Sequence, residues 1–164
     1  MEAIRLEIGA GSALEAGWLP WDIKDGNDAR SIRYESGTVD EIRAVHVLEH
    51  VGYFETLPTL IEWHRVLKPG GRLYVAVPDF EKIALAMFNG CDDPNLERYI
   101  VGGQTDKHDF HFALFWRQKL AFMLEQAGFC SVEKAAAYGT NTSTHWVSLN
   151  MSARKRSDVS AGGC

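Results

Sequence analysis

The sequence predicts an α/β fold with a mostly parallel sheet, and two neighbouring segments support this prediction. Residues 55–67 carry apolar side chains at helical spacing, and Arg72–Val77 is almost continuously apolar, as in a strand buried on both faces. Between them, the Lys-Pro-Gly-Gly segment at 68–71 has the composition of a type II turn. A helix, a tight turn and a buried strand make half of a βαβ unit, and ligands bind at the carboxyl ends of such strands.

Length and composition indicate one globular domain without a nucleic-acid or membrane partner. The 164 residues include 46% hydrophobic and 24% charged side chains, which is ordinary for globular proteins. The 22 acidic residues outnumber the 17 basic ones, which argues against nucleic-acid binding. No apolar run reaches the roughly 20 residues that span a bilayer, and three widely spaced cysteines suit a reducing compartment. We expect a cytoplasmic monomer or homodimer with a domain over 1–151 and a disordered tail over 152–164.

Short apolar segments bounded by turn residues are the other strand candidates. They lie at 4–8, 18–23, 31–34, 41–47, 129–136 and 145–151. The last segment alternates apolar and polar side chains, which predicts an antiparallel strand with one covered face. Only residues 12–17 separate the first two strands, whereas a parallel crossover usually needs about a dozen residues. The first crossover helix is therefore expected to be very short.

The remaining helices follow from apolar spacing and from capping residues. They are predicted at 80–88, 94–101 and 117–127, in addition to the helix at 55–67. The segment 104–116 has no clear periodicity and mixes histidines, aspartates and aromatic residues. We expect this segment to be a loop that covers the site.

Glycines and an acidic residue follow two of the predicted strands. Gly9 and Gly11 come directly after the first strand and allow the backbone to approach a ligand closely. A nicotinamide-binding fingerprint would have a further glycine three residues later, and that position is Leu14, which argues against a dinucleotide. Asp22 stands near the carboxyl end of the second strand, where an acid can accept hydrogen bonds from ribose hydroxyls.

Several motifs together resemble the class I S-adenosylmethionine-dependent methyltransferases, and most closely the small bacterial type 11 methyltransferases. The matching segments are LEIGAG (6–11), WDI (21–23), NDAR (27–30), VDEIRAVHVLEHV (39–51), EWHRVLKPGGRLYVAVPDF (62–80) and LEQAGF (124–129). The resemblance implies a Rossmann-like, seven-stranded, mostly parallel sheet with an antiparallel last strand, here with a shortened first crossover helix. It also implies methyl transfer from S-adenosylmethionine to a hydroxyl or amine of a small-molecule acceptor.

The resemblance further implies which residues hold the cofactor. These are Glu7, Gly9, Ala10, Gly11, Asp22, Asp28, Ala29, His46, Val47 and Leu48. The residues after the first strand would contact the amino-acid part of S-adenosylmethionine, with Glu7 at its ammonium group. Asp22 would bind the ribose, and Asp28 and Ala29 would contact the adenine.

Histidines near the predicted strand ends are candidates for the chemistry. S-adenosylmethionine already carries an activated methyl group, which leaves the protein to position the acceptor and remove a proton. We take His111 as the candidate general base, with His50 as a second catalytic residue. The set His46, Glu49, His50 and His111 also resembles the one with which some methyltransferases hold a divalent metal that polarises an acceptor hydroxyl. We favour the metal-free interpretation.

A second class of function is left open by the sequence. The chain could be a non-catalytic module of the same fold that binds the cofactor or a protein partner. The shortened segment between the first two strands motivates this alternative. Cofactor binding without turnover on any acceptor would distinguish it from an enzyme.

Overall fold

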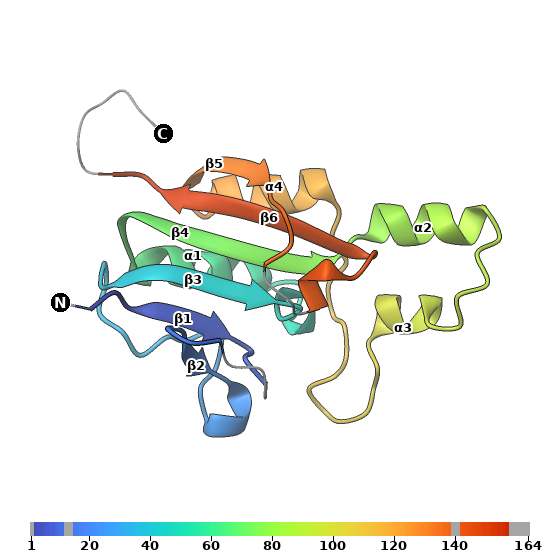
Figure 1. Cartoon of the computed structure of the whole chain (residues 1–164), viewed down its shortest axis with the longest axis horizontal. Coiled ribbons are helices and arrows are strands. Elements are labelled where there is room, and N and C mark those ends of the chain that lie inside the picture. The colour runs from blue at the N-terminus through green and yellow to red at the C-terminus, as the bar shows by residue number, and fades with distance from the viewer. Residues whose placement is uncertain (1, 12–14, 139–141, 158–164) are drawn as a thin grey trace.

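The computed structural model describes residues 2–11, 15–138 and 142–157, and the strands within them form one six-stranded sheet. The strand order is β2-β1-β3-β4-β6-β5 (Figure 1). The bounds are β1 (Arg5–Ile8), β2 (Leu19–Trp21), β3 (Val39–Val45), β4 (Leu67–Pro78), β5 (Phe129–Lys134) and β6 (Ser148–Lys155). The first four strands are parallel, and β6 is antiparallel to β4 and β5. The predicted α/β class and the antiparallel last strand are therefore confirmed.

Helices cover one face of this sheet in the part of the chain that the structure describes. Their bounds are α1 (Thr56–Val66), α2 (Phe80–Phe88), α3 (Leu96–Val101) and α4 (Arg117–Gln126), with short 3-10 turns η1 (Ile23–Asp25), η2 (Leu48–His50) and η3 (Thr142–Thr144). In Figure 1, α1 and α4 lie behind the sheet, whereas α2 and α3 extend beyond the carboxyl end of β4. Trp63 of α1 and Leu124 of α4 are fully buried in the core between the two layers. None of these helices has the length and apolarity needed to cross a membrane.

The described sheet has six strands instead of the expected seven, because residues 31–34 form no strand. Ile32 is buried in the core, and its N–H donates a hydrogen bond to Glu62 of α1 (2.9 Å). Arg65 of the same helix donates to the carbonyl oxygens of Ile32 and Tyr34 (3.0 Å each). Side chains of α1 thus satisfy backbone groups that would otherwise need a neighbouring strand.

The predicted helix, turn and strand over residues 55–77 are present, with one difference in extent. β4 begins at Leu67, directly after α1, and includes the predicted turn residues. Gly70 adopts a φ of 78°, which is the left-handed conformation that the turn requires. A Cβ atom on Gly71 would lie 2.8 Å from the carbonyl oxygen of Lys68, so a side chain there would collide with the backbone.

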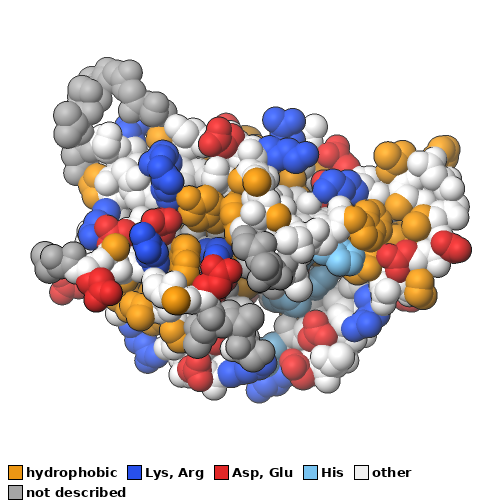
Figure 2. All heavy atoms as spheres, viewed as in Figure 1, with side chains coloured by type: hydrophobic (Ala, Val, Ile, Leu, Met, Phe, Trp, Pro, Cys, Tyr) orange, Lys and Arg blue, Asp and Glu red, His pale blue; other side chains and the backbone are white. Residues whose placement is uncertain are grey.

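The second face of the sheet is polar at the start of β4, which corrects the expectation that the whole strand at 72–77 is buried on both faces, although Ala76 on this face is fully buried. Arg72 is exposed and Tyr74 is half-buried, whereas Leu73 and Val75 between them are fully buried. This alternation is typical of a strand with one covered face. Charged side chains of both signs are interspersed on this face, which points toward the viewer in Figure 2.

A buried ion pair connects the two central strands on the polar face. Glu7 of β1 and Arg43 of β3 are only 4% and 5% exposed, and the Arg43 guanidinium donates to the Glu7 carboxylate. Arg43 also pairs with Glu15 (2.9 Å) and lies over the ring of Trp18, 4.3 Å from its centroid. Burial raises the pKa of Glu7 even though Arg43 opposes the shift. Either charge alone would be destabilising at this buried position, so the fold depends on both partners being present.

The folded domain extends beyond its predicted end at Met151. β6 continues to Lys155, whose Nζ donates hydrogen bonds to the carbonyl oxygens of His64, Arg65 and Leu67 at the end of α1. These bonds fasten the end of β6 to the helix layer. Residues 158–164 of the predicted tail lie outside the described residues.

We expect Arg43→Ala to lower the free energy of unfolding by about 3–5 kcal/mol, because it leaves the Glu7 carboxylate buried without its partner. Urea denaturation followed by circular dichroism measures this change. Arg5→Ala is the matched control, since the Arg5–Glu41 pair on the same strands is more exposed, and its loss should cost less than about 1 kcal/mol. Equal effects of the two substitutions would contradict the importance of the buried pair.

Candidate functional site

Three parallel strands end together at one edge of the sheet. Ile8 of β1 pairs with Ala44 of β3, and Val45 of β3 pairs with Ala76 of β4, so the residues that follow these strands lie close together. A cavity of about 470 Å³ opens at this edge, and Figure 2 shows histidine side chains gathered in the hollow. It is lined by Ile8, Gly9, Trp21, Asp22, Ile23, Asn27, Asp28, Ala29, Arg30, His46, Val47, His50, Val51, Gly52, Glu55, Lys107, His108 and Phe112.

Gly9 closes the wall of the cavity where β1, β2 and β3 end. It adopts a φ of 67°, and its N–H donates to the carbonyl oxygen of Trp21 (2.9 Å). A Cβ atom on Gly9 would overlap the side chain of Val47, which follows β3. Glycine is therefore required here by the packing of the protein itself, before any ligand is considered.

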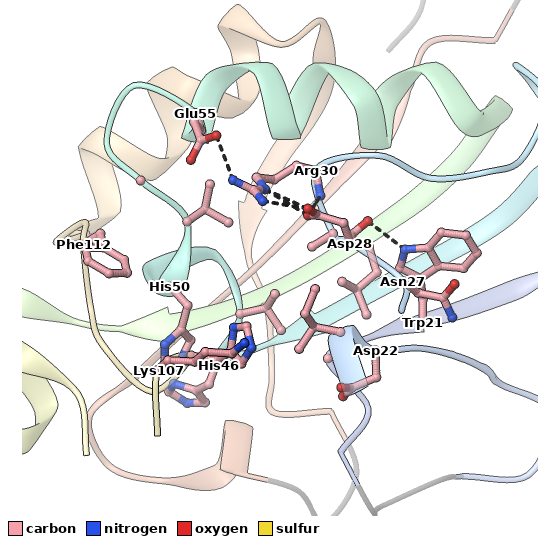
Figure 3. Close-up of a pocket in the computed structure, with 18 residues that line it drawn as sticks. Trp21, Asp22, Asn27, Asp28, Arg30, His46, His50, Glu55, Lys107 and Phe112 are labelled. Carbon is pink, nitrogen blue, oxygen red and sulfur yellow. Dashed lines mark hydrogen bonds and ion pairs between the residues drawn. The ribbon is translucent and has the colours of Figure 1, made fainter. Parts of the chain in front are cut away.

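Asp22 is buried at the end of β2 and organises the loops on either side of it. Its carboxylate accepts hydrogen bonds from the N–H of Gly11 (2.8 Å) and from the N–H of Lys24 (2.9 Å), where it caps η1. Each carboxylate oxygen has a second lone pair, so Asp22 can accept further hydrogen bonds from a bound ligand. The cavity thus has a fixed, buried acceptor at one end, opposite the histidines (Figure 3).

Two indole groups fix the backbone that forms the cavity wall between Asp28 and Ala29. The Nε1–H of Trp21 donates to the carbonyl oxygen of Asp28 (2.9 Å), and that of Trp63 donates to the carbonyl oxygen of Ala29 (2.8 Å). Trp63 is fully buried and Trp21 is 7% exposed, so both bonds are shielded from water. This segment is preorganised as a rigid surface.

Two ion pairs on Arg30 lie along the same wall of the cavity. Arg30 pairs with Asp28 (2.7 Å) and with Glu55 (2.8 Å), as Figure 3 shows. The hydrogen bonds from Arg30 hold the pKa of Asp28 below its usual range. The Asp28 carboxylate is therefore ionised and already occupied, which leaves its backbone and the neighbouring Ala29 to face a ligand.

His46 stands at the carboxyl end of β3 in a strained backbone conformation, with a φ of 54°. Its Nδ1 is 3.0 Å from the Glu49 carboxylate, and its Nε2 is 2.8 Å from the hydroxyl oxygen of Ser148. Since the Ser148 hydroxyl donates to the carbonyl oxygen of Thr142 (3.0 Å), it accepts from His46. Burial opposes protonation, but the hydrogen bond and charge of Glu49 outweigh it and raise the pKa of His46.

Glu49, His50 and His111 form a cluster beside His46. One ligand atom from each of the three side chains lies within 4.8 Å of the other two. Glu49 is 1% exposed, and its Oε2 has no hydrogen-bond partner among the described residues. His50 lines the cavity and Glu49 and His111 lie outside its lining, so the cluster begins at the cavity wall.

Comparisons with known proteins agree with this architecture. The model of a methyltransferase-domain family matches residues 22–75, which run from Asp22 through β3 and α1 to the middle of β4. A methyltransferase from Methanosarcina mazei that depends on S-adenosylmethionine superposes with a TM-score of 0.63 at 18% identity, over 96% of this chain and 95% of that one. One from Thermotoga maritima gives a TM-score of 0.61 at 16% identity, over 95% and 84% of the two chains. The chain has the fold of the class I methyltransferases.

Two further matches have longer chains than this methyltransferase-fold protein. Human N-acetylserotonin methyltransferase, solved with S-adenosylmethionine, superposes with a TM-score of 0.57 at 14% identity, over 94% of this chain and 41% of that one. An uncharacterized 37.1 kDa protein in transposon TN4556 of Streptomyces fradiae is 36% identical over 82 residues. This alignment spans 49% of the present chain and 21% of the relative.

The methyltransferase-fold cavity brings together most, but not all, of the predicted site residues. Gly9, Asp22, Asp28, Ala29, His46, Val47 and His50 line it, whereas Glu7, Ala10, Gly11, Leu48, Glu49 and His111 do not. Glu7 is engaged by Arg43, and Leu48 is fully buried in the core. The predicted covering loop at 104–116 does contribute to the cavity, although through Lys107, His108 and Phe112 rather than His111.

Sequence reasoning missed the contributions of Trp21, Arg30 and Glu55 to the cavity wall. Trp21 and Arg30 belong to the motifs WDI and NDAR, in which only Asp22, Asp28 and Ala29 are predicted site residues. Glu55 joins Arg30 across 25 residues, and nothing in the local sequence signals that pairing.

We expect Trp63→Phe to lower the free energy of unfolding by about 1–3 kcal/mol, because it leaves the carbonyl oxygen of Ala29 without its donor. Amide hydrogen exchange at residues 28–30 should accelerate, since the wall loses its anchor. Trp116→Phe is the control, because Trp116 is 37% exposed and its replacement should change stability by less than about 0.5 kcal/mol. Unchanged exchange at 28–30 in Trp63→Phe would show that the indole bond does not fix this segment.

Proposed function

We propose that the chain binds S-adenosylmethionine in the cavity at the carboxyl edge of the sheet and transfers its methyl group to a small-molecule acceptor. The observation that carries this proposal is the position of Asp22: it is buried directly after β2 and lies next to the segment of Gly9 that follows β1. A cavity of about 470 Å³ is within the range of small-molecule sites. The fold and the family match over residues 22–75 support the same assignment.

The residues present suit this cofactor at each part of the cavity. Asp22 offers carboxylate oxygens for two ribose hydroxyls, which is the recognition that an acid at this strand end provides. The preorganised backbone at Asp28 and Ala29 forms a wall for the adenine. The human neighbour that was solved with S-adenosylmethionine has the same fold, which supports the choice of cofactor.

The opposite end of the cavity is the proposed acceptor side. When bound, S-adenosylmethionine supplies a methyl group activated on a sulfonium, so the protein mainly has to orient the acceptor and manage one proton. His50 lines this end, and its Nδ1–H is held by the carbonyl oxygen of Phe110 (3.0 Å), which leaves Nε2 as the acceptor atom. Lys107 and Phe112 of the covering loop border the same space and would limit the size of the acceptor. An acceptor hydroxyl or amine fits these groups.

We expect Asp22→Ala to raise the Kd for S-adenosylmethionine at least about tenfold, which corresponds to about 1.4 kcal/mol. Isothermal titration calorimetry measures the affinity, and circular dichroism checks that the variant folds. Asp25→Ala is the matched control, because Asp25 is an exposed acid on η1 that does not line the cavity. Asp22→Asn keeps one acceptor oxygen and should fall between the two. Wild-type affinity in Asp22→Ala would contradict the proposed binding mode.

An acceptor screen then separates an enzyme from a non-catalytic module of the same fold. Wild-type protein is incubated with S-adenosylmethionine and a library of small hydroxyl and amine compounds, and formation of S-adenosylhomocysteine is followed. Turnover on any of them supports the proposed function. Tight cofactor binding with no turnover would favour the non-catalytic alternative.

A further inference from the structure

The cluster of Glu49, His50 and His111 presents its donor atoms in the form that a metal ion requires. The Nδ1 of His50 lies 3.0 Å from the carbonyl oxygen of Phe110, and the Nδ1 of His111 lies 3.2 Å from that of Tyr99. A carbonyl oxygen can only accept, so in both rings Nδ1 carries the proton. Nε2 is therefore the ring nitrogen of each histidine that is left to coordinate an ion, and backbone carbonyls that fix a histidine in this way are typical of metal sites.

Glu49 supplies a second and independent observation. Its side chain is 1% exposed, and its Oε2 is a buried carboxylate oxygen without a hydrogen-bond donor among the described residues. Leaving such an oxygen unpaired is costly, and a native structure usually satisfies it with a water, a proton or an ion. The other oxygen, Oε1, is held by His46 (3.0 Å), which fixes the orientation of the carboxylate.

We propose that Glu49, His50 and His111 bind a divalent transition-metal ion at the wall of the cavity. Two imidazoles and one carboxylate suit ions such as Zn²⁺, Co²⁺ or Fe²⁺ and leave further coordination positions open. The three ligand atoms lie within 4.8 Å of one another, and ligand bonds of about 2.0–2.2 Å would draw them together by small side-chain rotations. His46 does not serve as a ligand, because both of its ring nitrogens are engaged by Glu49 and Ser148.

The position of the site indicates what the ion would do. His50 lines the cavity at the end away from Asp22, so an open coordination position would face the acceptor side. Resting on the proposed function, we infer that the ion would bind an oxygen of the acceptor and lower the pKa of its hydroxyl as a Lewis acid. This selects hydroxyl-bearing compounds over amines as the acceptor class.

The test is metal binding by the whole chain, without cofactor or acceptor. Protein stripped with a chelator is titrated with Zn²⁺ and with Co²⁺ by calorimetry, and the visible absorption of Co²⁺ reports coordination by protein ligands. We expect one ion per chain and a rise in Tm on loading. We expect affinity to fall at least about tenfold in His111→Ala and in Glu49→Gln. His145→Ala is the control, since His145 is an exposed histidine outside both the cluster and the cavity lining, and this variant should bind the ion normally.

The outcomes separate this proposal from its alternatives. No ion binding by the wild type would overturn it and would indicate a shared proton between Glu49 and the histidines. Equal loss in His145→Ala and His111→Ala would also overturn it, since surface histidines would then account for the binding. If His111→Ala fails to fold, His50→Gln at the cavity wall tests the same donor set. Because cofactor affinity is measured separately on Asp22 variants, failure of the metal site and failure of the proposed function are distinguishable.

Discussion

The imidazole of His46 connects three segments of the chain at the carboxyl edge of the sheet. Its backbone N–H bonds to β4, and its ring nitrogens bond to Glu49 of η2 and Ser148 of β6. The Glu49 carboxylate raises the pKa of His46, which favours the protonated ring whose charge compensates the buried carboxylate. This contact holds η2 against β6, and through η2 it sets the position of His50 at the cavity. The shape of the histidine-lined end of the cavity therefore depends on His46.

The polar face of the sheet explains why Glu7, which was predicted to hold the cofactor, does not line the cavity. Described helices cover one face, and the strands accordingly alternate, with Glu7 and Arg43 on the face that has no described helix. Alternation is strict in a strand, so a Glu7 side chain on the polar face cannot also contribute to the helix-covered core. Arg43 then neutralises Glu7 within the sheet. Under the proposed function, the amino-acid end of the cofactor would therefore be held by the backbone near Gly9 and not by Glu7.

Local chemistry was sufficient to predict most elements and the strand ends that form the site. The Pro-Gly turn near the start of β4, the glycine after β1 and the acid after β2 are each dictated by a short segment, and the structure places them at these strand ends. Contacts across long separations were not predictable. Arg65 replaces a strand partner for Ile32, and Ser148 reaches His46 across 102 residues. The position of His111 outside the cavity lining depends on the path of a loop that has no periodic signal.

The central claim, that S-adenosylmethionine binds at the carboxyl edge of the sheet, is tested most directly by NMR on isotope-labelled protein. Backbone amides are assigned, and S-adenosylhomocysteine, the demethylated product, is titrated in. We expect the largest shift changes at Gly9, Asp22, Asp28 and His46, with amides of α4 unaffected. Absence of changes at any concentration, or changes centred on the smaller hollow at 68–72 at the opposite end of β4, would contradict the account.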